Sequence, residues 1–349
     1  NPVQYNGFKL IRAKVAPIGA GSGIEEIEAI FHQGNFAEPE KKGTVTHHDS
    51  LVDKFVEFIH SKTDIKSLKP LRVVMDAGNG MAGLVAPKMF AGTNIETIPM
   101  FFELDGNFPN HEANPLLEEN RLDLIAKVKE TSADFGVGYD GDSDRCFFVD
   151  DRGRFLDGDF MTGLIGAYLL EKNPGATIFY DVRCSRYVAD VVSRAGGKPF
   201  MWKVGHALTK PKMKEEKALF GGEVSGHFYF LFDDYYADNS YLPVFLVAEM
   251  ISRKEQKLSE IMAEKDNYFI SGEINSTVKD PDKIMQEIEE KYGPKGNIIR
   301  IDGLSVVSDK WWLNIRKSNT EPLLRLNCEA DSQQNMESLR DELLAIIRS

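Results

Sequence analysis

Short apolar runs that end in glycine turns alternate with helical repeats along much of the chain. The β-branched run at 71–76, "LRVVMD", enters the turn "AGNGMAG", and residues 94–106 form a second run of this kind. Such runs are typical of strands. Residues 121–130, "RLDLIAKVKE", have apolar positions at helical spacing. This alternation predicts an α/β domain over residues 44–154 with a mainly parallel sheet.

The same alternation returns between residues 155 and 266. A helix is predicted from Asp159, followed by a strand at 176–182 and a second helix at 186–197 that closes on two glycines. Residues 198–205 then return as a strand. The pattern predicts a second α/β unit that resembles the first.

From residue 267 the pattern changes to an α+β alternation. Predicted strands at 269–278 and 298–308 flank a helix that begins at Pro281, a favoured first helical position, and ends at Gly293. Further strands are predicted at 311–318 and 322–330. The last helix begins near Ser332, and one of its faces carries Met336, Leu339, Leu343 and Ile347.

The composition excludes several classes of partner. The 349 residues carry a formal net charge of −12, and such a surface repels nucleic acid and anionic membranes. The apolar stretch at 241–251 is too short to cross a bilayer and is predicted to be a core helix. Three cysteines, far apart in the sequence, suit a reducing compartment. We therefore expect a cytoplasmic protein with no nucleic-acid or membrane partner.

Residues 1–43 show no domain pattern of their own. The chain begins with Asn1 rather than Met, and no signal peptide is visible. We interpret this stretch as the end of a domain whose beginning lies upstream.

Three aspartates at alternate positions stand between two apolar runs in "GYDGDSDRCFFVDDRG" (138–153). Asp140, Asp142 and Asp144 repel one another unless a cation neutralises them, and hard oxygen ligands in a short loop suit Mg²⁺. Arg145 could hold a phosphate that shares the metal. The alternative is a solvated acidic turn.

A complete G-x-G-x-x-G pattern follows the first predicted strand. Gly78, Gly80 and Gly83 form it, and Glu103 near the end of the next strand completes what a dinucleotide site would show. The alternative is a strand-to-helix turn that needs glycine for close packing.

Two glycine-flanked segments, "WKVGHALTK" (202–210) and "FGGEVSGHFYF" (220–230), place polar side chains at the ends of predicted strands. Glu223, Ser225 and His227 alternate, so they could face one side and bind a polyol. A hairpin turn with one satisfied histidine is the alternative.

The segment "RKSNTEP" (316–322) joins a guanidinium to hydroxyls and an amide between two predicted strands. Arg316 could grip a phosphate in a bidentate manner, with neutral donors beside it. A polar turn is the alternative. At the start of the chain, Lys9 in "NPVQYNGFK" is a candidate acid/base or phosphate group.

Taken in order, these segments resemble the motifs of the α-D-phosphohexomutases, most closely the phosphomannomutase/phosphoglucomutase branch. That family carries T-x-S-H-N-P-x-x-Y-N-G-x-K, D-G-D-x-D-R, G-E-x-S-G-H and R-x-S-N-T-E-P. The chain has "NPVQYNGFK", "DGDSDR", "GEVSGH" and "RKSNTEP". The asparagine in "SNTEP" resembles the residue that the hexose mutases carry at this position, where the glucosamine mutases usually carry glycine.

The resemblance implies a fold class: three related mixed α/β domains, the first truncated here, and a C-terminal α+β domain around a central cleft. The predicted divisions are 1–43 for the remnant of domain 1, 44–154 for domain 2 with the metal loop, 155–266 for domain 3 with the sugar loop, and 267–349 for domain 4 with the phosphate loop.

The resemblance also implies the reaction. Hexose 1-phosphate and 6-phosphate, of mannose and also of glucose, would interconvert through a phosphoserine enzyme and hexose 1,6-bisphosphate, with Mg²⁺ on Asp140, Asp142 and Asp144. The family's serine precedes "NP" in the motif, so it would lie upstream of Asn1. The chain as given is therefore expected to be inactive.

Individual roles follow from the resemblance too. Lys9 would be the acid/base, with a pKa lowered by neighbouring cations; Arg145 would stabilise the transferring group, and His227 is a second acid/base candidate. The phosphorylated hexose would be bound by Arg183, Gly205, His206, Glu223, Ser225, His227, Arg316, Ser318, Asn319 and Thr320. A monomer or weak dimer is expected.

Two other function classes stay open at this point. A dinucleotide-binding oxidoreductase would use the turn at Gly78, Gly80 and Gly83. A non-catalytic sugar-phosphate binding protein would use the same loops as the mutase but without turnover.

Overall fold

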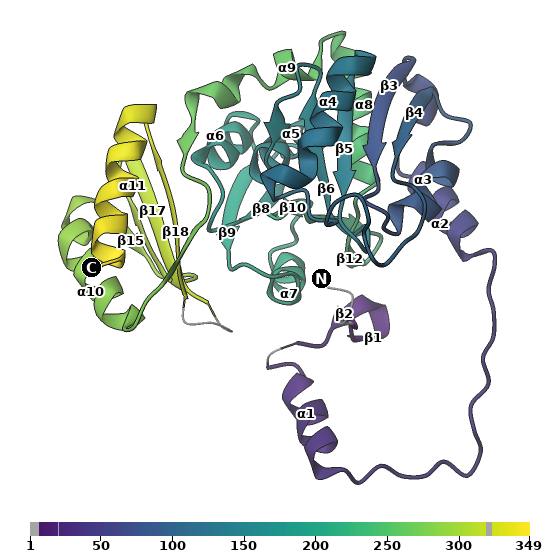
Figure 1. The fold of residues 1–349 in the computed structure, drawn as a ribbon, viewed down its shortest axis with the longest axis horizontal. Helices are drawn as coiled ribbons and strands as arrows, with labels where there is room; N and C mark the ends of the chain where they lie inside the picture. Colours follow the sequence, from purple (N-terminus) through teal and green to yellow (C-terminus); the bar gives the residue numbers. More distant parts are fainter. Residues whose placement is uncertain (1–6, 20, 319–322) are drawn as a thin grey trace. The chain divides into compact units, whose positions relative to one another are not determined.

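The computed structural model describes residues 7–19, 21–318 and 323–349. These residues, drawn as a ribbon in Figure 1, form two compact units. The first unit contains the described residues up to Leu156, together with Gly205–Lys217 and His227–Leu258. The second contains Asp157–Val204, Ala218–Gly226 and the described residues from Ser259 onward. The division at residues 43, 154 and 266 stays a prediction.

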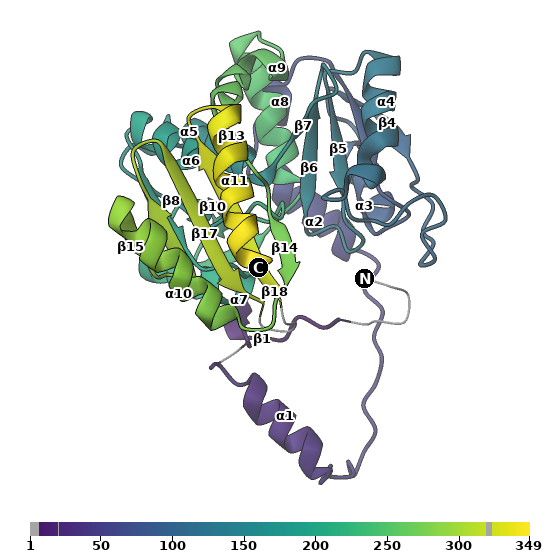
Figure 2. The same ribbon diagram turned by 60° about the vertical axis from the view of Figure 1, so that its left-hand side comes forward.

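A five-stranded sheet with the order β4-β3-β5-β6-β7 forms the centre of the first unit. β3 pairs in parallel with β4 and β5 (Figure 1), whereas β6 is antiparallel to both β5 and β7 (Figure 2). The predicted mainly parallel sheet is thus a mixed sheet, because the short loop after β5 permits only an antiparallel return. The strands are β3 (Leu71–Asp76), β4 (Ile95–Met100), β5 (Phe135–Tyr139), β6 (Cys146–Asp150) and β7 (Phe155–Leu156).

Helices bury their apolar positions against this sheet. Leu124 and Val128 of α4 join Val74 and Val149 in one apolar cluster. The predicted core helix is confirmed as α8, which is buried from Leu242 to Ser252. The helices of this unit beyond its N-terminal segment are α2 (Leu51–His60), α3 (Ala82–Phe90), α4 (Leu122–Thr131), α7 (His206–Glu215) and α8 (Leu242–Lys254), with 3₁₀ turns η2 (Ile65–Ser67) and η3 (Glu118–Arg121).

Two hairpins complete the first unit. β11 (Phe228–Phe232) pairs antiparallel with β12 (Tyr235–Asp238), and β1 pairs antiparallel with β2 near the N-terminus. The N-terminal elements are β1 (Ile11–Arg12), η1 (Ala13–Val15), β2 (Ala16–Pro17) and α1 (Ile24–Gln33).

Three parallel strands and two helices open the second unit. β8 pairs in parallel with β9 and β10, and α5 and α6 pack against each other and against these strands. Gly222 lies so close to Thr162 of α5 that an added Cβ would stand 2.0 Å from its hydroxyl oxygen. The elements are α5 (Gly158–Leu170), β8 (Thr177–Asp181), α6 (Arg186–Arg194), β9 (Lys198–Trp202), β10 (Phe220–Gly222), α9 (Leu258–Ile261), which begins at the boundary with the first unit, and η4 (Ala263–Asn267).

The C-terminal part of the second unit is an antiparallel sheet with two helices on it (Figure 1). Helices α10 and α11 share one apolar core with the strands, which includes Ile288, Met336 and Leu343. The elements are β13 (Phe269–Ile270), β14 (Ile274–Thr277), α10 (Pro281–Tyr292), η5 (Gly293–Lys295), β15 (Asn297–Ile299), β16 (Leu304–Val307), β17 (Trp311–Lys317), β18 (Leu323–Ala330) and α11 (Gln333–Ile347).

Two predicted strands of this region are each broken in two. Residues 298–308 form the hairpin β15–β16, because Gly303 turns the chain at a φ of 73°. Residues 269–278 divide into β13 and β14, which both pair with β18, and Gly272 has a φ of 68° between them. Backbone with positive φ favours glycine and interrupts a strand. The predicted helices from Pro281 and Ser332 are confirmed.

Candidate active site

The three aspartates converge in the loop between β5 and β6. Each of Asp140, Asp142 and Asp144 offers a carboxylate oxygen that lies within 4.8 Å of the others. Burial, followed by the charges of Asp144 and Asp142, raises the pKa of Asp140 to about 7. This is the electrostatic cost that a cation would remove. A set of hard oxygen donors at this spacing fits Mg²⁺.

Lys9 lies beside this loop, and the predicted lowering of its pKa is not what the structure gives. Its Nζ is hydrogen-bonded to Asp144 and lies 3.3 Å from Asp238. Partial burial alone would lower the pKa of Lys9, but the hydrogen bond to Asp144 and the charges of Asp238, Asp144 and Asp142 raise it above its ordinary value. The reason is that the chain surrounds this ammonium with carboxylates, where neighbouring cations were expected.

Arg145 and His227 contact the same carboxylates. Nε of Arg145 lies 3.4 Å from Asp140 and 3.7 Å from Asp144. Nε2 of the buried His227 lies 3.2 Å from Asp144 and 3.4 Å from Nε of Arg145. Although burial raises the pKa of Asp144, hydrogen bonds with His227 and Lys9 bring it far below the ordinary value.

Two charged residues at this site, Lys210 and Asp238, were not predicted from the sequence. Nζ of Lys210 lies 2.7 Å from Asp238, at the end of β12, and 5.8 Å from the centre of the Tyr229 ring. Burial, followed by the charges of Lys210 and Lys9, lowers the pKa of His206. Lys210 follows His206 by one helical turn on α7, and this spacing in "GHALTK" could have been read from the sequence.

Gly205 and His206 stand at the start of α7. Gly205 has a φ of 116° at the N-cap, a value that a residue with a Cβ rarely adopts, and His206 is the first helical residue. The structure thus brings Lys9, Arg145, His206 and His227 into the same unit as the three aspartates.

The sugar-loop candidates Glu223 and Ser225 belong to the second unit. They lie in the turn after β10, so the predicted alternation along a strand is wrong; instead the Ser225 hydroxyl donates to the Glu223 carboxylate at 2.8 Å. Arg183 binds Asp181 through Nε at 2.9 Å and Nη2 at 2.8 Å, and Nη2 lies 3.8 Å from Glu223. Asp181, at the carboxyl end of a parallel strand, is a position where ligand sites are common.

The phosphate-loop candidates also lie in the second unit. Nη2 of the buried Arg316 lies 2.6 Å from Glu273, and Arg325 lies 3.4 Å from the Ser318 hydroxyl. Burial raises the pKa of Glu273, but the charges of Arg316 and Arg183 reverse this and lower it. Asn319 and Thr320 lie outside the described residues. Glu273 was not singled out from the sequence, where nothing marks it.

The turn after β3, which carries Gly78 and Gly80, is packed against the loop between β5 and β6 that carries the three aspartates. The N–H of Met81 donates to the carbonyl of Gly141 at 3.0 Å, and a Cβ on Gly80 would lie 2.6 Å from the same oxygen. These glycines allow another backbone to approach closely, and that place is occupied by the protein's own Gly141.

A buried ion pair holds the start of this turn. His111 Nε2 lies 3.0 Å from Asp76, and His111 Nδ1 lies 2.9 Å from the carbonyl of Glu112. Both ring nitrogens face acceptors, an arrangement that suits the imidazolium. The hydrogen bond to Asp76 raises the pKa of His111, burial opposes this, and the Glu112 carbonyl and the charges of Asp76 and Asp123 add to the rise.

This pair gives a pH-dependent stability. Because the pKa of His111 is raised on folding, its contribution is complete below the unfolded value, about 6.5, and is lost as the pH rises through the folded value. We expect His111→Gln to lower the midpoint of thermal unfolding at pH 6, by an amount equivalent to about 1 to 3 kcal/mol. The difference should shrink at pH 9. The exposed His32 is the control, and an equal loss at both pH values would contradict the assignment.

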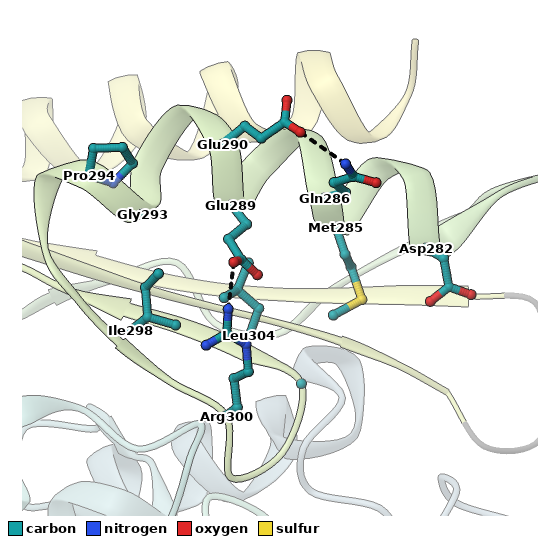
Figure 3. A pocket seen from close by; sticks show the side chains of 11 residues that line it. Asp282, Met285, Gln286, Glu289, Glu290, Gly293, Pro294, Ile298, Arg300 and Leu304 are labelled. Carbon is teal, nitrogen blue, oxygen red and sulfur yellow. Dashed lines mark hydrogen bonds and ion pairs between the residues drawn. The ribbon is translucent and has the colours of Figure 1, made fainter.

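A cavity of about 740 Å³ lies between α10 and the β15–β16 hairpin (Figure 3). Its side chains include Met285 and Ile298, and an ion pair of 2.5 Å joins Glu289 to Arg300 across it. None of the candidate residues lines this cavity.

Sequence models of a known family match most of the chain. They are described as phosphoglucomutase/phosphomannomutase, alpha/beta/alpha domain II (residues 49–153), alpha/beta/alpha domain III (residues 157–268) and C-terminal domain (residues 273–346). The chain belongs to this family. Both the resemblance and the mixed α/β fold class are thereby confirmed.

Individual proteins of the phosphoglucomutase/phosphomannomutase family are also similar to this chain. The chain is 39% identical to the phosphomannomutase of Escherichia coli K12, over 95% of this chain and 74% of that protein, and 40% identical to that of Vibrio cholerae, over 98% and 75%. A solved family structure from Burkholderia thailandensis superposes with a TM-score of 0.82 at 32% identity, over 94% of this chain and 70% of that chain. No helix in the described part of the chain is long and apolar enough to cross a membrane.

Proposed function

We propose that this protein is a phosphohexomutase that interconverts the 1-phosphate and 6-phosphate of mannose, and also of glucose. The observation that carries the proposal is the convergence of three carboxylates with Lys9, Arg145 and His227 in one unit of a chain from this family. Phosphoryl transfer requires positioning and charge neutralisation more than covalent chemistry by side chains, and this constellation supplies both.

Asp140, Asp142 and Asp144 would hold Mg²⁺. When bound, the cation withdraws charge from the phosphoryl group and lets two anions approach each other. Arg145, which already contacts two of these carboxylates, is placed to neutralise the equatorial oxygens of the transferring group.

Lys9 would move the proton of the attacking sugar hydroxyl. For this it must lose a proton, and the present carboxylate partners Asp144 and Asp238 oppose that loss. For Lys9 to act in this way, its contact with Asp144 would have to be exchanged for a contact with substrate. His227, whose Nε2 faces the same carboxylate, is the second acid/base candidate.

Other candidate residues would bind the sugar and its second phosphate. Glu223 and Ser225 present a carboxylate and a hydroxyl to sugar hydroxyls, and Arg316 with Ser318, Asn319 and Thr320 would grip the phosphate that is not being transferred. Arg183 would support Glu223 through their contact of 3.8 Å. Gly205 and His206 are proposed to bind the substrate as well.

Hexose 1,6-bisphosphate would be the intermediate and activator, because the sugar must reverse its orientation between the two transfers. We propose that the reaction takes place in the cytoplasm, a proposal supported by three cysteines that form no disulfide, as is usual in a reducing compartment. The protein is proposed to act as a monomer or weak dimer.

The proposal is tested by ³¹P NMR of mannose 1-phosphate with Mg²⁺, a trace of hexose 1,6-bisphosphate, and the chain extended upstream by the segment that carries the family's serine. We expect the resonance of mannose 6-phosphate to appear. Hexose-phosphate binding without turnover would instead favour a binding protein. Saturable micromolar binding of NAD(H) without turnover would favour the dinucleotide-binding oxidoreductase.

A further inference from the structure

The turn at residues 77–81, the glycine turn, contacts the loop that carries the three aspartates. The glycine turn follows β3, and the metal loop, residues 140–145, follows β5. These strands pair in parallel, with Asp76 opposite Gly138. Parallel neighbours end at the same edge of a sheet, so the two loops leave the sheet side by side. Their contact is therefore built into the strand order of the fold.

The glycine turn is itself held rigidly. The Asp76 carboxylate accepts a hydrogen bond from the N–H of Gly78 at 2.8 Å and is bound to His111 by its other oxygen. Asn79 has a φ of 59°, and its side-chain amide donates to the carbonyl of Glu103 while its oxygen accepts from Asn110, each at 2.8 Å. A residue kept in left-handed backbone by this many partners forms a fixed surface.

This surface presses on the metal loop at Gly141, the residue between two of the carboxylates. Met81 donates its N–H to the Gly141 carbonyl, and the Cα of Gly80 approaches so closely that a Cβ would stand 2.6 Å from that oxygen and 2.9 Å from the Cα of Gly141. Backbone atoms cannot swing aside as the end of a long side chain can. Only glycine at position 80 allows this approach.

The other flank of the metal loop is held at Ser143, which has a φ of 61°. The Ser143 hydroxyl lies 2.9 Å from the Tyr241 hydroxyl, and the Ser240 hydroxyl donates to the Ser143 carbonyl at 2.7 Å. The centre of the Tyr241 ring lies 6.0 Å from that of Phe55 and 5.5 Å from that of Tyr139. This packing fixes the position of the Tyr241 hydroxyl.

Like charges a few ångströms apart push each other away, and a free loop would relieve this by opening. A loop that is hydrogen-bonded on both flanks keeps its carboxylates together before a cation arrives. Ligands that are already in place bind a cation more tightly. We propose that the glycine turn and the Ser240–Tyr241 pair hold the metal loop from both sides and thereby set its affinity for a divalent cation. Gly80 and Tyr241 are then positioning residues. The inference rests on the proposed function and adds to it the residues that tune the metal site.

The test is a titration of residues 1–349 with Mn²⁺, in which electron paramagnetic resonance measures the free and bound Mn²⁺. Mg²⁺ serves as the competitor. This readout requires no turnover. We expect Gly80→Ala to weaken binding about tenfold or more, as loss of a group that orients metal ligands does. Tyr241→Phe keeps the ring and loses one hydrogen bond, so about a threefold to tenfold loss is expected. Gly106→Ala is the matched control, because a Cβ there meets no atom within 4 Å and the expected affinity is unchanged.

Thermal unfolding of each variant separates affinity from folding. If Gly80→Ala does not fold, Tyr241→Phe and Ser240→Ala decide the question: weaker Mn²⁺ binding with an unchanged unfolding midpoint supports the proposal. Folded variants that bind Mn²⁺ as the wild type does would overturn it and leave the proposed function intact. Absence of saturable Mn²⁺ binding by the wild type would overturn the metal assignment, and the inference with it.

Discussion

Residues 1–349 by themselves are expected to convert no detectable mannose 1-phosphate into mannose 6-phosphate. In the family motif that "NPVQYNGFK" resembles, the serine that carries the phosphoryl group precedes the asparagine, and a polypeptide of residues 1–349 alone does not contain a counterpart of it at that place. Charge neutralisation by Arg145, and by a cation that Asp140, Asp142 and Asp144 would hold, assists a transfer but cannot replace the group that receives the phosphate. The loss should therefore be complete rather than partial.

The measurement is a ³¹P NMR time course on two proteins under identical conditions: residues 1–349, and the same chain preceded by the serine-bearing segment. The matched control is the extended chain with that serine replaced by alanine, which should be as inactive as residues 1–349 while it still binds hexose 1,6-bisphosphate. Turnover by residues 1–349 alone would place the nucleophile within them and make the proposed mechanism wrong.

The metal loop could be predicted from sequence because its ligands are local. Three aspartates at alternate positions in one turn between two strands must lie close together whatever the rest of the chain does. Helix α11 could be predicted for the same reason, since apolar spacing within one segment decides which face is buried. Helix α8 could be predicted because its apolar run is nearly continuous, and it is buried from Leu242 to Ser252.

The site contacts that could not be predicted join residues far apart in the chain. Asp238 is 229 positions from Lys9, yet it lies 3.3 Å from the ammonium and helps to raise its pKa. No local pattern contains that pairing. Asp181 and Glu273 were overlooked in the same way, although each is ion-paired to a predicted binding residue, Arg183 and Arg316 respectively.

The hairpin at 298–308 is a different kind of error, because its signal was in the sequence. Asp302 and Gly303 form an aspartate-glycine pair between two apolar runs, which is among the strongest short-range signals for a hairpin turn. The run was predicted as one strand because its apolar residues are nearly continuous. In the structure, Gly303 supplies the left-handed backbone that β15 and β16 require to pair.

Replacing Lys9 by methionine in the extended chain is expected to lower kcat by a factor of about 10² to 10⁴, the usual contribution of a positioned acid/base group. Methionine keeps an unbranched chain of similar length and removes the ammonium, so the change tests the proton-transfer role and the charge of the group together. KM should change much less, because the proposed grip on the sugar and on its resting phosphate comes from Glu223, Ser225 and Arg316.

Lys62→Met is the matched control. Lys62 is a lysine of the same unit whose ion pair, with Asp233 at 3.2 Å, involves none of the candidate residues, and an exposed pair of this kind contributes little. The two variants should therefore differ in kcat by about the whole predicted factor. If Lys9→Met turns over as fast as Lys62→Met, Lys9 is not the acid/base. In that case His227, which contacts the same Asp144 carboxylate, becomes the group to replace next, since it is the other proton carrier beside the metal loop.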